Sequence, residues 1–150
     1  MDKCCKVAAV YVAWLKAMSH IHQHNHWTTK GAEFYGDHLL FKRLYDSAIE
    51  DLDKAAEKFI GVFDEECVDY KLQANLVCKL LLKYNKLKNN PATMSLAVEK
   101  EFIKFSKLAY DCFEKEDTLT LGLDDMIMAI ASNREESVYL LKQKIARSED

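Results

Sequence analysis

The stretch HWTTKGAEFYGDHLLFKRLYDSAIEDLDKAAE, residues 26–57, contains a spaced set of side chains that can bind a metal. His26 and His38 are twelve residues apart, Asp53 follows His38 by fifteen, and Glu57 follows Asp53 by four. On a helix, Asp53 and Glu57 therefore lie one turn apart on the same face. Two imidazoles and two carboxylates form a ligand set suited to iron or another first-row transition metal.

A turn at residues 28–31, Thr-Thr-Lys-Gly, separates two helical patterns and sets the positions of the two histidines. We expect a first helix from Cys4 or Cys5 to Trp27 and a second from Ala32 to Gly61, because apolar residues recur at intervals of three and four along both. If these helices fold back antiparallel about residue 32, positions 26 and 38 lie level. The two imidazoles then belong to one half of a site.

The two carboxylates cannot complete this site within one chain. A helix rises about 1.5 Å per residue, so His38 and Asp53 lie roughly 22 Å apart along it. Two copies packed antiparallel across a two-fold axis near Tyr45–Ser47 would bring His38 of one copy beside Asp53 and Glu57 of the other. The sequence therefore predicts a metal site at a subunit interface. The face involved is an outer stripe of the second helix: His38, Lys42, Tyr45, Ile49, Asp53 and Glu57.

This stretch resembles the miniferritins, the Dps-like proteins of the ferritin-like superfamily. The residues that match the family pattern are His26-Trp27, Gly31, Phe34, His38, Phe41, Tyr45, Asp53 and Ala56-Glu57. In that family two histidines come from one subunit, and an aspartate and a glutamate come from its two-fold neighbour. The resemblance implies that His26, His38, Asp53 and Glu57 are the metal ligands and catalytic residues of a ferroxidase centre.

The resemblance also implies a fold, an assembly and an activity. The fold would be an all-α, ferritin-like four-helix bundle with an extra helix in the B–C connection, forming a single domain over residues 1–150. Twelve subunits would form a hollow shell, a homo-oligomer with metal sites at its two-fold interfaces. The shell would oxidise Fe(II), with hydrogen peroxide or O2, and store ferric iron, which protects against oxidative damage.

The rest of the chain favours long helices and a single core. Only four glycines and one proline occur among 150 residues, too few for a chain with many turns. Apolar periodicity predicts further helices at about residues 69–88, 93–115 and 121–146. His20, His22 and His24 precede His26 in alternation, and no glutamate stands between them as an HExxH motif requires. We expect all three to be surface or shell-facing histidines.

Charge, hydropathy and cysteine usage exclude several partners. The net charge of −3, with termini that read MDKCCK and ARSED, offers little for phosphate binding, so we do not expect DNA binding. No apolar run approaches the ~18 residues of a membrane span. The five cysteines are an odd number without a CxxC pair, which predicts reduced thiols and a cytoplasmic location.

Lys42 departs from the family pattern and leaves alternatives open. Many miniferritins carry a carboxylate one turn after the second histidine, where this chain has Lys42. A cation there would repel a second iron unless its amine points away or loses its proton. One alternative function is a ferritin-like shell with impaired or lost ferroxidase activity that acts as a structural or DNA-associated scaffold. Another is a ferritin-like site that holds zinc or manganese.

Overall fold

The computed structural model describes the backbone of residues 1–149 and the side chains of residues 1–146. The acidic ending ARSED therefore lies almost wholly outside the described side chains. Within the described part, four long helices and one shorter helix account for most of the chain. They are α1 (Lys3–Thr28), α2 (Phe34–Val62), α3 (Tyr70–Tyr84), α4 (Pro91–Lys115) and α5 (Leu121–Glu149), with short 3-10 helices η1 (Glu65–Val68) and η2 (Asn85–Leu87) on either side of α3.

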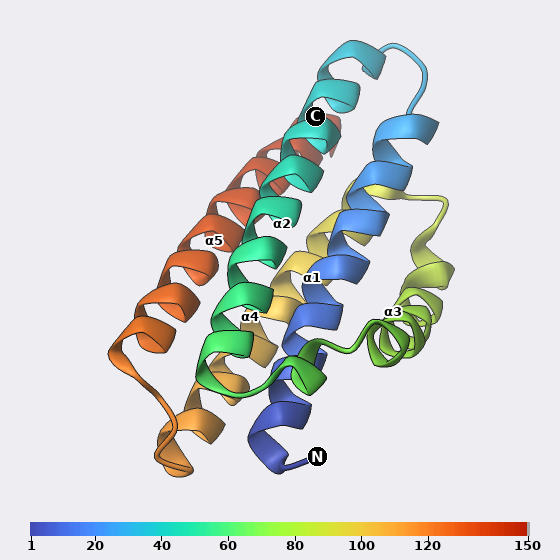
Figure 1. The fold of residues 1–150 in the computed structure, drawn as a ribbon. Coiled ribbons are helices and arrows are strands. Elements are labelled where there is room, and N and C mark those ends of the chain that lie inside the picture. The colour runs from blue at the N-terminus through green and yellow to red at the C-terminus, as the bar shows by residue number, and fades with distance from the viewer. Residues whose placement is uncertain (150) are drawn as a thin grey trace.

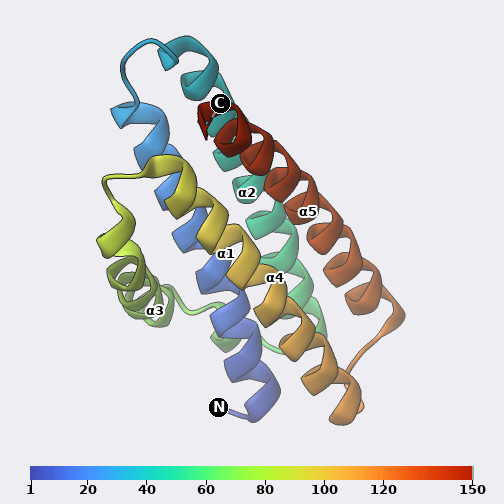
Figure 2. The ribbon, with the colours of Figure 1, turned by 180° about the vertical axis from the view of Figure 1, so that it is seen from behind.

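The four long helices form a bundle, and α3 crosses outside it. Helix α1 runs up the bundle and α2 returns beside it, while α4 runs down and α5 returns (Figures 1 and 2). The connection from α2 to α4 must travel the length of the bundle, because both helices run in the same direction. Helix α3 lies within this connection, against the outer side of α1. The predicted all-α, ferritin-like bundle with an extra helix between its second and third long helices is confirmed.

Short polar contacts fix where the long helices begin. The Asp2 carboxylate accepts a hydrogen bond from the Cys5 backbone N–H at 2.8 Å and caps α1. Asn90 caps α4 through the Thr93 N–H, and Pro91 occupies the first helical position, where its missing N–H costs nothing. Gly31, with φ of +97°, makes the turn before α2 that an L side chain would strain. These ends agree with the sequence prediction to within about two residues.

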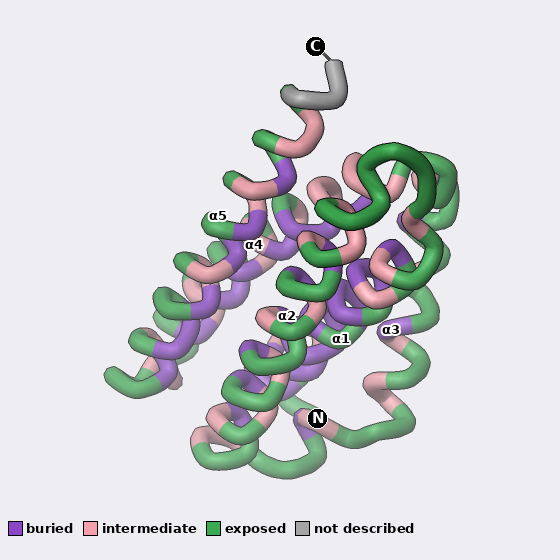
Figure 3. Tube along the Cα trace, turned by 90° about the horizontal axis from the view of Figure 1, so that it is seen from above, coloured by how far each residue is buried: buried purple, intermediate pink, exposed green. Residues whose placement is uncertain are grey.

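The bundle core is built from the inward faces of all four long helices, as the tube coloured by burial shows (Figure 3). Tyr11 packs edge-on against Phe59 at 5.3 Å and Phe102 at 5.0 Å between ring centroids, which joins α1, α2 and α4. Apolar residues of α2 that recur at intervals of three and four form its core face, and one of them, Leu52, is only half-buried. The fully buried members are Phe41, Leu44, Ala48, Ala55 and Phe59.

The cysteines correct one sequence prediction. Cys5 and Cys67 form a disulfide with an S–S distance of 2.05 Å, so the expectation that all five are reduced thiols is wrong for this pair. Cys4, Cys78 and Cys112 remain free thiols. The disulfide ties η1 to the start of α1. Across residues 1–149, none of the helices combines the length and apolar character that crossing a bilayer requires.

Candidate metal centre

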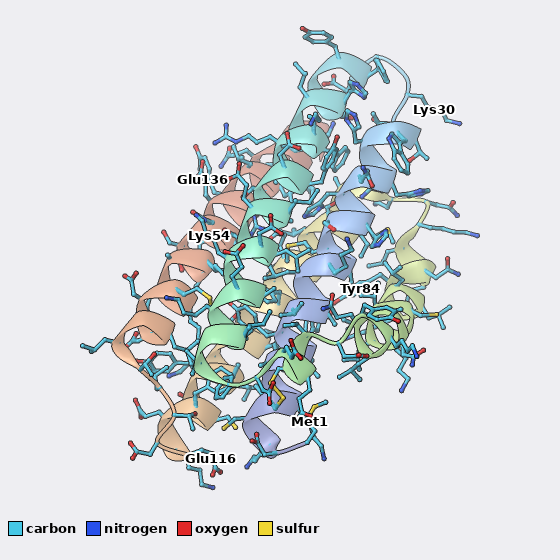
Figure 4. The ribbon with its side chains drawn as sticks, in the orientation of Figure 1. Met1, Lys30, Lys54, Tyr84, Glu116 and Glu136 are labelled. Atoms are coloured by element: carbon cyan, nitrogen blue, oxygen red, sulfur yellow. A yellow bond between two sulfur atoms is a disulfide. The ribbon has the colours of Figure 1, made fainter. Side chains whose placement is uncertain are left out.

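His26 and His38 face each other across the α1–α2 turn. Their rings stack with centroids 3.8 Å apart and an interplanar angle of 21°. The predicted level placement of the two positions is therefore confirmed. The pair lies at the end of the bundle near the α1–α2 turn, which the Lys30 label marks in Figure 4.

Reciprocal hydrogen bonds fix which nitrogen of each imidazole is free. His26 Nδ1 lies 2.7 Å from the His38 carbonyl oxygen, and His38 Nδ1 lies 2.9 Å from the His26 carbonyl oxygen. A carbonyl oxygen only accepts, so each Nδ1 must be the protonated nitrogen. In the neutral imidazole, Nε2 then carries the lone pair. Both rings are thus held in the tautomer and orientation of a metal-binding histidine, with a backbone carbonyl as the supporting partner.

An aromatic ring packs against each member of the histidine pair. Phe34 stacks on His38 at 4.9 Å, and Tyr45 meets His26 edge-on at 5.4 Å between centroids. This end of the molecule nevertheless leaves large apolar side chains open to solvent. Trp27 is 66% exposed and Tyr35 is 75% exposed. Exposed aromatic surface of this kind, next to a polar site, is typical of a surface that a partner covers.

The carboxylates lie far along the same unbroken helix. Asp53 and Glu57 are both exposed on α2, one turn apart. Because α2 is continuous from Phe34 to Val62, the roughly 22 Å between positions 38 and 53 follows directly from the helical rise. Glu57 also borders a groove of about 740 Å³ between α2 and α5, whose opposite wall includes Asp125.

A single chain supplies only part of a coordination sphere. Among the residues that the structure describes, no three histidine, cysteine, aspartate or glutamate side chains converge to hold one ion. The histidine pair and the carboxylate pair are two separate halves on the outer stripe of α2. Ile49 lies between the two halves and is 40% exposed, so the stripe also has an apolar centre that is not covered within this chain.

Lys42 is bound to its own helix. Its Nζ lies 2.9 Å from both Asp46 carboxylate oxygens, one turn away, and 4.6 Å from the centre of the Tyr45 ring. The hydrogen bonds to Asp46, and then Tyr45, raise the pKa of Lys42, so the amine stays protonated. Tyr45 contacts both Lys42 and His26, which places the ammonium at most about 10 Å from the His26 ring. Asp46 offsets its charge there.

A buried polar network at the bundle centre was not predicted. The Arg134 guanidinium is fully buried, with Nε 3.2 Å from Glu99 Oε2 and NH1 3.6 Å from Asp51 Oδ2. His22 donates from Nε2 to Glu99 Oε1 at 3.0 Å, and its Nδ1 lies 2.9 Å from Ser95 Oγ. Each of the four bundle helices contributes one of these ionisable groups. The expectation of a surface position is therefore wrong for His22, because Glu99 and Ser95 satisfy its nitrogens inside the core. His20 and His24 are exposed, as predicted.

The sequence carries a signal of this network, namely a charged residue within a stripe of core residues. The apolar stripe of α5 has a gap between Ile130 and Val138, and Arg134 occupies the middle of it. Asp51 and Glu99 likewise fall at helical spacing among core residues. An interruption of a core stripe by one charged residue on several helices indicates a shared buried network.

Two solved structures have this fold over nearly the whole chain. Dps from Thermosynechococcus elongatus superimposes with a TM-score of 0.78 at 14% identity, covering 95% of this chain and 90% of that one. DpsC from Streptomyces coelicolor superimposes with a TM-score of 0.71 at 14% identity, covering 95% of this chain and 83% of that one. No protein-family model and no curated protein sequence matches the chain. At this identity the likeness establishes the fold, and the chain has the Dps-like form of the ferritin-like fold.

Proposed function

We propose that this chain is the subunit of a miniferritin shell that oxidises Fe(II) and stores the ferric product. Iron is the substrate and the cargo, and hydrogen peroxide or O2 is the oxidant. Each ferroxidase centre uses His26 and His38 of one subunit and Asp53 and Glu57 of its two-fold neighbour. The likeness to two Dps structures supports the proposal at the level of fold.

The orientation of the histidine pair supports the proposal most strongly. Two stacked imidazoles that both donate from Nδ1 to backbone carbonyls leave both Nε2 lone pairs for a ligand. A histidine pair that served only in packing or at the surface would not require hydrogen bonds that leave the same nitrogen, Nε2, free on both rings. Imidazole binds a metal only when it is neutral, so iron oxidation should weaken in acid.

Asp53 and Glu57 would supply the anionic oxygen ligands that the two histidines lack. Hard anionic oxygens are more strongly attracted to Fe(III) than to Fe(II), so Asp53 and Glu57 would favour the oxidised state. Both side chains are exposed in the single chain and are free to approach a second copy. In an antiparallel pair, the exposed Ile49 side chains would pack near the two-fold axis and exclude water between the two sites.

Paired variants test the ligand assignment. His26→Ala/His38→Ala and Asp53→Ala/Glu57→Ala should each lower peroxide-driven Fe(II) oxidation by at least about 10–100-fold, the loss typical even of residues that only orient a ligand. Glu50→Ala is the matched control, because Glu50 is an exposed carboxylate on the same helix, outside the proposed centre. Oxidation that survives both double substitutions in assembled particles would contradict the assignment.

Mixed assembly tests whether the centre is shared. If the two double variants are refolded together in equal amounts, half of the dimers should be mixed, and each mixed dimer regains one of its two centres. About a quarter of the wild-type centres should then return, a consequence of two-fold symmetry. Mixed particles that oxidise no iron, although wild-type particles do, would show that the centre is not shared in this way.

A scaffold without iron chemistry is the second candidate function, and Lys42 favours it. A cation within about 10 Å of His26 opposes a second iron, although Asp46 offsets its charge. Iron titration separates the two functions, since a scaffold would assemble without binding Fe(II) at the two-fold interface. A DNA gel shift tests the DNA-associated form, for which we expect no binding. Light scattering should report a closed particle near twelve subunits for either function.

A further inference from the structure

Helix α3 begins a basic stretch of the chain and lies outside the four-helix bundle, against α1 (Figures 1 and 2). Residues 70–98 contain five lysines and no aspartate or glutamate, although acidic residues outnumber basic ones, 24 to 21, in the whole chain. The lysines are Lys71, Lys79, Lys83, Lys86 and Lys88. A single sign of charge gathered on one exposed element favours a partner of the opposite charge.

Most of these lysines have no acidic partner within the chain. Lys83 pairs with Glu101 on α4 at 3.2 Å. Among the described residues, no carboxylate pairs with the other four lysines, and all four are exposed. The acidic residue just before the helix, Asp69, serves as its cap, because its carboxylate accepts hydrogen bonds from the Lys71 and Leu72 backbone N–H groups at 3.0 and 2.9 Å. The positive charge of α3 and of the turn after it is therefore largely uncompensated.

Helix α3 also exposes a row of apolar or weakly polar side chains at intervals of four: Tyr70, Ala74, Cys78 and Leu82. Residues at this spacing lie on one side of a helix. Tyr70 is 75% exposed and Leu82 is 69% exposed. The opposite side of α3 packs on α1 through Val77, so the exposed row has no partner within the bundle. A groove of about 460 Å³ with a mainly apolar lining separates the row from His20 of α1.

We infer that α3 docks on the surface of a bilayer that contains anionic lipids. The lysine ammonium groups meet the lipid phosphates, while their aliphatic stems lie along the apolar surface. Leu82 and Cys78 enter the boundary between headgroups and acyl chains, and Tyr70 lies at the headgroup level, where tyrosine is enriched. The helix has 15 residues and several lysines, so it lies flat on the bilayer and does not cross it.

A nucleic acid and a second copy of the chain fit this face less well. The phosphates of a nucleic acid contact polar donors and would leave Leu82 and Tyr70 exposed. Pairing α3 with α3 of a second copy would set lysines against lysines, and like charges across an interface repel. An anionic bilayer offers both negative charge and an apolar boundary. No residue of α3 belongs to the proposed metal centre, so the inference does not rest on the proposed function.

Vesicle sedimentation tests the inference with the full-length, iron-free protein. The protein should sediment with vesicles of phosphatidylcholine mixed with phosphatidylglycerol, but not with vesicles of phosphatidylcholine alone. Added salt should weaken the binding, because it screens the lysines. Lys71→Gln/Lys79→Gln should weaken it roughly 30-fold, from about 5-fold for each lysine near an anionic surface. Leu82→Ser should weaken it about 10-fold, because an apolar side chain no longer enters the boundary.

Matched variants on α4 separate docking through α3 from a general effect of charge or surface apolarity. Lys100→Gln/Lys104→Gln removes the same charge from two exposed lysines, and Leu108→Ser changes a leucine that is 67% exposed. Both should leave vesicle binding essentially unchanged, and circular dichroism checks that every variant remains folded.

Failure of the wild type to sediment with the mixed vesicles at low salt would overturn the inference, as would equal losses in the α3 and α4 variants. So would a DNA gel shift that the α3 lysines cause while the vesicles stay unbound, which would assign the face to nucleic acid. A change of particle size in Leu82→Ser, without vesicle binding by the wild type, would assign the face to a second copy.

Discussion

Replacing Arg134 with methionine tests whether the buried ion pairs hold the bundle together. The guanidinium compensates two buried carboxylates, at 3.2 Å from Glu99 and 3.6 Å from Asp51. The carboxylate oxygens that face it accept no hydrogen bond from any described residue. Methionine is apolar and would leave both charges without a cation. Removing one partner of a buried ion pair costs about 3–5 kcal/mol. For a chain of this length, that should lower Tm by roughly 6–20 °C.

Urea unfolding followed by circular dichroism measures this loss, at one fixed protein concentration because the proposed assembly would itself stabilise the fold. Arg43→Met is the matched control: Arg43 pairs with Glu136 on the surface, where both side chains are more than half exposed, and such pairs contribute about 0–1 kcal/mol. Adding Glu99→Gln to Arg134→Met should recover part of the stability, since it removes one uncompensated charge. If Arg134→Met costs no more than Arg43→Met, the network does not stabilise the bundle and the reasoning fails.

Three further predictions concern Lys42, the disulfide and Asp51. Lys42→Asp should raise tight iron binding from one to two ions per centre, and it should speed up peroxide-driven Fe(II) oxidation measured by stopped flow. If neither the number of ions nor the rate changes, the ion pair with Asp46 already neutralises the lysine. Cys67→Ser opens a loop of 62 residues and should lower the free energy of unfolding by up to about 4 kcal/mol, and reduction of the wild type should have the same effect. A loss of stability in Cys67→Ser no larger than that in Cys78→Ser would contradict this. Burial raises the pKa of Asp51 above its ordinary 3.8, so its contribution favours folding in acid and is lost as pH rises through the raised pKa. Asp51→Asn should weaken the dependence of the free energy of unfolding on pH over that range. An unchanged pH dependence would show that other groups cause it.

The helices and half of the candidate site follow from local sequence patterns. Apolar residues at intervals of three and four place all five helices, because an amphipathic helix must turn one face to the core. The level placement of His26 and His38 follows from the short turn between their helices, which leaves few ways for the chain to return. Even the connection helix is close to prediction, except that its last turn tightens into a 3-10 helix at Asn85–Leu87.

The features that local patterns miss depend on how distant segments meet. Cys5 and Cys67 are 62 residues apart, and they pair only because the long connection brings η1 against the start of α1. His22 looks like a surface residue within a run of alternating histidines, and only Glu99 and Ser95 on α4 make its burial possible. Spacing along one helix does not predict which polar groups a second helix will supply.

The disulfide also bears on the predicted cytoplasmic location. That prediction rests on reduced thiols, and the Cys5–Cys67 bond removes this argument. Disulfides persist mainly in oxidising compartments and are rare in cytosolic proteins. A cytoplasmic location therefore stays a prediction, which fractionation of cells that produce the protein would test.

Anomalous scattering at the iron edge, from crystals soaked with Fe(II) without oxygen, would locate the metal in the assembled protein. The shared-centre proposal predicts a peak at each two-fold interface, within bonding distance of His26 Nε2 and His38 Nε2 of one chain. The same peak should lie beside the Asp53 and Glu57 carboxylates of the neighbouring chain. Iron bound only in the groove between Glu57 and Asp125, or by ligands of a single chain, would contradict the account.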